Sequence, residues 1–197
     1  LKIRDVGTGL TVSADDDNLV VRALRSVDRR ASIELIKRIP AGAGLGGGSS
    51  DAAAILRWAG ELDPAEAVGI GADVAFCLAG GRARVTGIGE LIEPLAHVPT
   101  VYTLLIPPFG VSTPAVYRRW DAMGGPVGGY GNDLEPAAVA VDPRLGEWRD
   151  ALHEATGVRP RLAGSGGTWF VEGDFPSVAH RGVTAIVAAT VEASAGR

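Results

Sequence analysis

The fold is decided by the run Pro40-Ala41-Gly42-Ala43-Gly44-Leu45-Gly46-Gly47-Gly48-Ser49-Ser50-Asp51-Ala52-Ala53. Apolar and polar residues alternate in the segment before this run, residues 32–39, as they do in a half-buried strand. After the run, apolar residues recur at helical spacing as far as Gly60. The sequence therefore predicts a strand, a glycine-rich loop and a helix in that order, with Ser49-Ser50-Asp51 as the helix cap and Gly60 as its end.

A glycine-rich loop that enters a helix is suited to holding an anion. Glycines allow backbone N–H groups to turn towards a ligand, and the helix N-terminus adds about half a positive charge. A merely flexible turn would not need a serine pair at the helix start. Gly42, Gly44 and Gly47 fit the dinucleotide pattern G-x-G-x-x-G, but Pro40 interrupts the tight turn and residues 61–67 are polar. The Walker pattern also fails because no G-K-[ST] follows, so a third kind of phosphate loop is indicated.

Composition places the chain among globular proteins. Its 197 residues correspond to about 1.3 average domains, with 46% hydrophobic and 21% charged residues. The net charge of −4, with dispersed basic residues, argues against a nucleic-acid partner. A single cysteine, Cys77, and three scattered histidines offer neither a disulfide nor a zinc pattern. No apolar run is long enough to span a membrane or to form a signal core, so we expect a cytoplasmic protein without a membrane partner.

Patterning along the rest of the chain predicts a mixture of helices and strands. The expected elements are two short strands or a hairpin at 1–12, a helix at 18–27, strands at 83–85 and 101–106, a helix opened by Thr113-Pro114, a helix at 145–156, a strand-turn-strand unit at 161–171 and a strand at 183–191. Composition changes most sharply over residues 93–100. We therefore expect two domains, 1–97 and 98–197.

Residues 40–53 resemble the second signature of the GHMP kinases, in which a glycine and serine loop wraps the phosphates of ATP. Further stretches resemble signatures of the same family in the same order: 70–76, 87–90, 111–113, 132–135 and 163–168. The triple glycine followed by Ser-Ser-Asp-Ala-Ala is most similar to the branch that acts in non-mevalonate isoprenoid biosynthesis. The resemblance extends from about residue 18 to residue 171.

The resemblance implies both a fold and a reaction. The fold is α+β, with a ribosomal protein S5 domain 2-like N-terminal half, a ferredoxin-like C-terminal half and the site between them. The reaction is ATP-dependent phosphorylation of the 2-hydroxyl group of 4-diphosphocytidyl-2-C-methyl-D-erythritol, with Mg²⁺ bound to the nucleotide. The implied partners are this small molecule and ATP.

The resemblance also assigns roles to individual residues. Asp73 is the catalytic carboxylate, for which a helix cap or a turn aspartate is the alternative. Thr113 contacts the substrate, or caps a helix before Pro114. The residues implied in phosphate binding are Pro40, Gly42, Gly44, Leu45, Gly46, Gly47, Gly48, Ser49, Ser50, Gly164, Ser165 and Gly166. Helix capping by the two serines and a tight turn at residues 164–166 are the structural alternatives.

One family signature is absent from the sequence. The family carries a Pro-x-Lys-x-Asn stretch near its N-terminus, whereas Lys2 and Lys37, the only lysines here, lie in other contexts. The aromatic pair that stacks on cytidine after that stretch is also absent. We therefore expect the chain to lack the N-terminal edge of a two-domain kinase. A catalytically incomplete chain that binds nucleotide phosphate, or another small-molecule kinase of the family, is the alternative.

Overall fold

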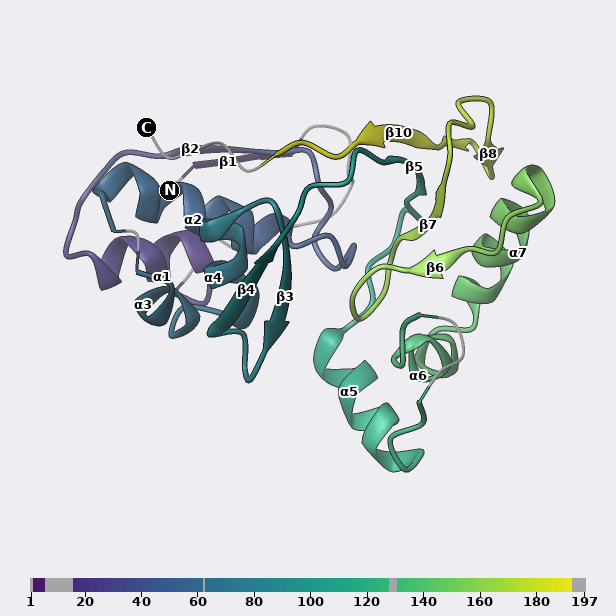
Figure 1. The fold of residues 1–197 in the computed structure, drawn as a ribbon, viewed down its shortest axis with the longest axis horizontal. Coiled ribbons are helices and arrows are strands. Elements are labelled where there is room, and N and C mark those ends of the chain that lie inside the picture. The colour runs from purple at the N-terminus through teal and green to yellow at the C-terminus, as the bar shows by residue number, and fades with distance from the viewer. Residues whose placement is uncertain (1, 6–15, 62, 128–130, 193–197) are drawn as a thin grey trace.

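A computed structural model describes residues 2–5, 16–61, 63–127 and 131–192 of the chain (Figure 1). The helices are α1 Leu19–Ser26, α2 Gly47–Ala59, α3 Pro64–Val68, α4 Ala72–Ala79, α5 Thr113–Ala122, α6 Glu135–Val141 and α7 Arg144–Thr156. The strands are β1 Lys2–Asp5, β2 Glu34–Lys37, β3 Arg82–Thr86, β4 Leu91–Leu95, β5 Val101–Leu105, β6 Arg161–Leu162, β7 Trp169–Glu172, β8 Ala179–His180, β9 Val183–Thr184 and β10 Ile186–Ala189. This mixture confirms the α+β class.

The first group of elements is built around α2. Its buried residues Ala52, Ala53 and Leu56 face α1 and α4, where Ala23 and Val74 complete the core. Small side chains at these positions allow the helices to approach closely while still excluding water. β1 pairs with β2 in parallel, and β3 pairs with β4 as an antiparallel hairpin. The segment between β2 and α2 is thereby fixed at both ends.

The second group is an antiparallel sheet with helices packed against it. The strand order is β10-β5-β7-β6, and α5, α6 and α7 lie together beside the sheet (Figure 1). Leu105, Leu145 and Trp169 are fully buried in this second core. Burial of side chains of this size stabilises a domain by roughly 1.5 to 3 kcal/mol each.

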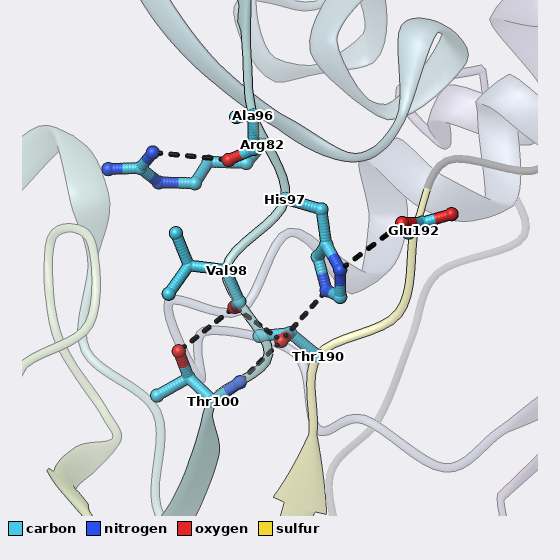
Figure 2. Close-up of polar contacts among 7 residues, drawn as sticks. All are labelled: Arg82, Ala96, His97, Val98, Thr100, Thr190 and Glu192. Carbon is cyan, nitrogen blue, oxygen red and sulfur yellow. Dashed lines mark hydrogen bonds and ion pairs between the residues drawn. The ribbon is translucent and has the colours of Figure 1, made fainter.

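The segment that joins the two groups is tied to the end of β10 (Figure 2). The Thr190 hydroxyl accepts a hydrogen bond from the Thr100 amide at 3.0 Å and donates one to the Val98 carbonyl at 3.2 Å. His97 Nε2 lies 3.2 Å from the same hydroxyl, and its Nδ1 lies 3.8 Å from a Glu192 oxygen. The two separate cores on either side of this segment support a division at residue 97, which stays a prediction.

Two predicted helix starts are wrong, that of α2 by three residues or more and that of α5 by one. α2 begins at Gly47, and Gly46 is its N-cap, with φ of 64° and no side-chain capping bond. The serines therefore lie inside the first turn, where Ser50 Oγ donates to the Gly47 carbonyl. In α5 the N-cap is Ser112, whose hydroxyl accepts from the Ala115 amide, so Thr113 is the first helical residue.

Two strand predictions also need correction. The strand expected at 183–191 is divided into β9 and β10, because the Ala185 amide turns away to donate to the Val178 carbonyl. β4 was not predicted, since Pro94 argues against a strand interior; it lies in a two-stranded hairpin with open edges. Of the two short strands or hairpin expected at 1–12, only residues 2–5 are described: they form a strand, as expected, and it pairs in parallel with β2.

Glu135, the first residue of α6, is buried with an incompletely paired carboxylate. Among the described residues its Oε2 has no hydrogen-bond partner, and Arg149 Nη1 lies 3.5 Å from Oε1. Burial raises the pKa of Glu135 more than Arg149 lowers it. The folded protein therefore binds this proton more tightly than the unfolded chain. Its stability contribution is complete at low pH and is lost as pH rises towards the raised pKa.

We expect Glu135→Gln to raise the thermal unfolding midpoint at pH 7 and to flatten the fall in stability above pH 4.5, the ordinary pKa of the group. The neutral amide has the same shape without the buried charge. Thermal melts between pH 4 and 8 measure this, with the exposed Glu154→Gln in α7 as the control. A lower midpoint for Glu135→Gln at pH 7 would show that the ion pair with Arg149 outweighs burial.

Candidate functional site

A cavity of about 630 Å³ lies where the two groups of elements meet. Three segments form most of its wall: the glycine-rich segment 40–48, the first turn of α4 and the second glycine turn at 164–165. The lining residues are Leu19, Lys37, Pro40, Ala41, Gly42, Ala43, Gly44, Leu45, Gly46, Gly47, Gly48, Ser49, Asp73, Thr113, Tyr117, Gly131, Asn132, Leu134, Gly164 and Ser165.

The glycine-rich segment presents the N-terminus of α2 to this cavity. Gly42, Gly44 and Gly46 have φ of 72°, 73° and 64°, a region that other residues rarely adopt. Gly46 caps the helix without a side chain, so no side-chain oxygen occupies the place of an anion. The first-turn amides and the positive end of the helix dipole are therefore chemically suited to an anion.

The second glycine turn packs against the first, backbone on backbone. A Cβ atom added to Gly44 would lie 2.1 Å from the Ala163 carbonyl oxygen, and one added to Gly167 would lie 2.3 Å from the Gly42 carbonyl oxygen. No side chain fits between segments this close. The two turns thus hold each other in place across the cavity wall, although they are more than a hundred residues apart in the sequence.

Side chains from α5 and from the start of α6 hold the second turn. Asn132 Nδ2 donates to the carbonyls of Leu162 at 2.8 Å and Gly164 at 2.7 Å. The Thr113 hydroxyl lies 2.6 Å from the Ser165 hydroxyl, so each can orient the other towards the cavity. The 132–135 stretch thus forms a turn and helix start, and Asn132 also fixes the glycine turn.

Asp73 brings a carboxylate to the cavity from the first turn of α4. The N-cap of that helix is Gly71, so the alternative of Asp73 as a helix cap is wrong. Asp73 is exposed, and none of the described side chains pairs with it. Burial raises the pKa of the Cys77 thiol one turn further on, and the negative charge of Asp73 raises it further. The catalytic role of Asp73 stays a prediction.

Lys37 is a cavity residue that the sequence argument passed over. Its side chain is only 6% exposed, and its Nζ donates to Asp51 Oδ2 at 2.5 Å. The alternation in residues 32–39 indicated that Lys37 is buried, because a period of two places it on the same face as the apolar Leu35 and Ile39. A lysine on the buried face of a strand is rare unless it is paired.

Most of the predicted site residues line the cavity. Ser50 and Gly166 do not: Ser50 lines a smaller space of about 170 Å³ together with Lys37 and Asp51, and Gly166 is buried within the second turn. Tyr117 and Asn132 line the cavity without having been predicted. Tyr117, 51% exposed, follows Thr113 by one helical turn, and that spacing could have identified it.

The described residues contain no group of three or more His, Cys, Asp or Glu side chains placed to hold a metal ion. None of the helices in the described ranges is long and apolar enough to cross a membrane.

Comparison with known proteins gives a consistent result. The family model described as GHMP kinases N terminal domain matches residues 18–81. The 4-diphosphocytidyl-2-C-methyl-D-erythritol kinase of Paracoccus denitrificans is 39% identical over 188 residues, covering 86% of this chain and 68% of the relative. The enzyme of the same name from Paramagnetospirillum magneticum is 37% identical over 200 residues, covering 83% of this chain and 70% of the relative.

Solved structures agree with the sequence relatives. A crystal structure of 4-(cytidine 5'-diphospho)-2C-methyl-D-erythritol kinase superposes with a TM-score of 0.68 at 30% identity, covering 96% of this chain and 82% of the other. Homoserine kinase from Cytophaga hutchinsonii superposes with a TM-score of 0.54 at 17% identity, covering 97% of this chain and 82% of the other, and shares the fold.

Proposed function

We infer the function of this chain from its family: it belongs to the GHMP kinases, in the branch of the 4-diphosphocytidyl-2-C-methyl-D-erythritol kinases. The resemblance drawn from residues 40–53 is thereby confirmed, and the chain is a small-molecule kinase. We propose that it transfers the γ-phosphoryl group of ATP to the 2-hydroxyl group of 4-diphosphocytidyl-2-C-methyl-D-erythritol, in isoprenoid precursor biosynthesis. The observation that carries this proposal is one cavity that joins an open helix N-terminus to the Asp73 carboxylate.

Phosphoryl transfer depends on positioning the phosphates and compensating their charge. The α2 N-terminus and the segment 42–48 supply backbone donors for the phosphate oxygens, and the Asn132-anchored second turn keeps them in place. Mg²⁺ takes few protein ligands and several phosphate oxygens, which fits a cavity whose described lining has one carboxylate, Asp73, and hydroxyl groups such as that of Ser49. When bound there, it would neutralise phosphate charge.

In the proposed reaction Asp73 acts on the acceptor hydroxyl group. The hydroxyl oxygen forms a new bond to the γ-phosphorus as the bond to the β-phosphate oxygen breaks, and its proton must leave. A carboxylate without a cationic partner keeps its capacity to accept or orient that proton. The electron pair of the broken bond stays on the β-phosphate oxygen, and ADP leaves.

The wall from the second group of elements is suited to the nucleobase of the acceptor. Tyr117 exposes half of its surface beside Thr113, and an exposed aromatic ring offers a stacking face to any base. This placement supports a substrate that carries a nucleobase, as the proposed cytidine substrate does.

ADP release measures the proposed function. With ATP and Mg²⁺ we expect turnover of 4-diphosphocytidyl-2-C-methyl-D-erythritol and none of homoserine. Tyr117→Ala should raise KM for the cytidine substrate about tenfold, because stacking on an aromatic side chain contributes about 1 to 3 kcal/mol per base, while Tyr117→Phe stays close to wild type. Preference for homoserine would favour another kinase of the family. Nucleotide binding without turnover of any alcohol would favour the catalytically incomplete alternative.

A further inference from the structure

The cavity holds very little charge for a site that must accept a triphosphate. Among the described residues that line it, Lys37 carries the only positive charge and Asp73 the only negative one. ATP brings several negative charges, and backbone donors alone leave most of them uncompensated.

Lys37 lies close enough to the glycine loop to reach a bound phosphate. Its Nζ is 3.5 Å from the point that a Cβ atom on Gly47 would occupy, and Gly47 is the first residue of α2. Lys37 and Gly47 also border the smaller space that Asp51 lines. The ammonium group thus lies beside the first residue of α2, which lines the cavity as well.

The partner of Lys37 in the free protein is an internal anion. Asp51 is 23% exposed and lies just after the first turn of α2. It neutralises a buried ammonium that would otherwise be unstable. A lysine ammonium has three donors, so one bond to Asp51 leaves donors for a second oxygen.

Resting on the proposed function, we propose that Lys37 binds nucleotide phosphate, and that Asp51 holds its charge in place while the cavity is empty. A phosphate bound at the α2 N-terminus pairs with the Lys37 ammonium, whose charge Asp51 neutralises in the empty protein. Asp51 therefore lowers the affinity for phosphate, because it competes for the ammonium group, whereas Lys37 raises it.

Isothermal titration with AMP-PNP, ADP and AMP tests this assignment. Lys37→Met should weaken AMP-PNP and ADP about ten- to a hundredfold, as expected for a hydrogen bond to a charged group, and should change AMP by less than about threefold. Asp51→Asn should tighten AMP-PNP and ADP about threefold or more. This variant keeps the lysine and the shape of its partner, so it tests the proposal even if Lys37→Met does not fold.

The double variant Lys37→Met with Asp51→Asn distinguishes a direct contact between Lys37 and phosphate from an effect of the net charge of the pair. It has the same net charge as the native pair, so an effect of net charge alone predicts wild-type affinity, whereas we expect AMP-PNP to stay at least tenfold weaker. Arg25→Met and Asp16→Asn, from an exposed ion pair, are the matched controls and should change nothing. If both single variants bind AMP-PNP, ADP and AMP more weakly, and to the same extent, the pair has a purely structural role. Failure of the wild type itself to bind AMP-PNP would instead overturn the proposed function.

Discussion

Asp73→Asn is expected to lower kcat about a hundred- to ten-thousandfold, the usual range for losing a positioned general base, while AMP-PNP binding stays within about threefold of wild type. Asparagine has the shape of aspartate but accepts no proton. No described side chain pairs with Asp73, so the substitution breaks no ion pair, and the helix is capped by Gly71 rather than by Asp73. A fall in kcat without a fall in stability is therefore the expected signature.

The matched control for this variant is Asp63→Asn, at the start of the neighbouring helix α3. Asp63 Oδ1 accepts from the Ala65 amide at 2.8 Å, so this substitution tests the loss of a carboxylate near a helix start outside the cavity. We expect a stability loss of about 1 kcal/mol or less and an unchanged kcat. Steady-state kinetics together with thermal melts separate the two cases. Full turnover by Asp73→Asn would show that the acceptor proton leaves by another route.

The glycine-rich loop and the helix after it were predictable because their signals are local. Strand alternation before Pro40, the glycine run and the apolar spacing up to Gly60 lie within one short stretch, and each has a direct structural reading. The start of α2 was predicted too late because glycines usually mark a loop, whereas here Gly47 and Gly48 continue the helix and leave its end open for a ligand. The local rule failed at a helix start that has no side-chain cap, which is where we propose that phosphate binds.

Two of the pairings that the sequence did not reveal depend on how the chain folds back on itself. Asn132 reads locally as part of a turn, and only the fold brings its amide to the carbonyls of Leu162 and Gly164. Lys37 is separated from Asp51 by the whole glycine loop, so their pairing follows from the way that the loop folds back. Tertiary pairings of this kind have no periodic signal, even though they decide which groups face the cavity.

Gly44→Ala is expected to destabilise the protein by about 2 to 5 kcal/mol and to weaken AMP-PNP binding at least tenfold. The backbone there has φ of +73°, which adds about 1 to 2 kcal/mol of strain for a residue with a Cβ atom. The new methyl group would also lie 2.1 Å from the Ala163 carbonyl and 2.7 Å from the Gly166 carbonyl, and overpacking of this kind contributes about 1 to 3 kcal/mol more. The two glycine turns must therefore separate.

Gly60→Ala isolates the part of this effect that comes from backbone strain. Gly60 ends α2 with φ of +81°, and a Cβ atom there would meet nothing within 4 Å. We expect its unfolding free energy to fall by only about 1 to 2 kcal/mol and its AMP-PNP affinity to stay at the wild-type value. Denaturant titration and isothermal titration of both variants give the comparison. Because both positions have a left-handed backbone, equal losses would mean that contact between the turns contributes nothing, whereas loss of affinity in Gly44→Ala alone would show that the second turn holds the phosphate loop in its binding conformation.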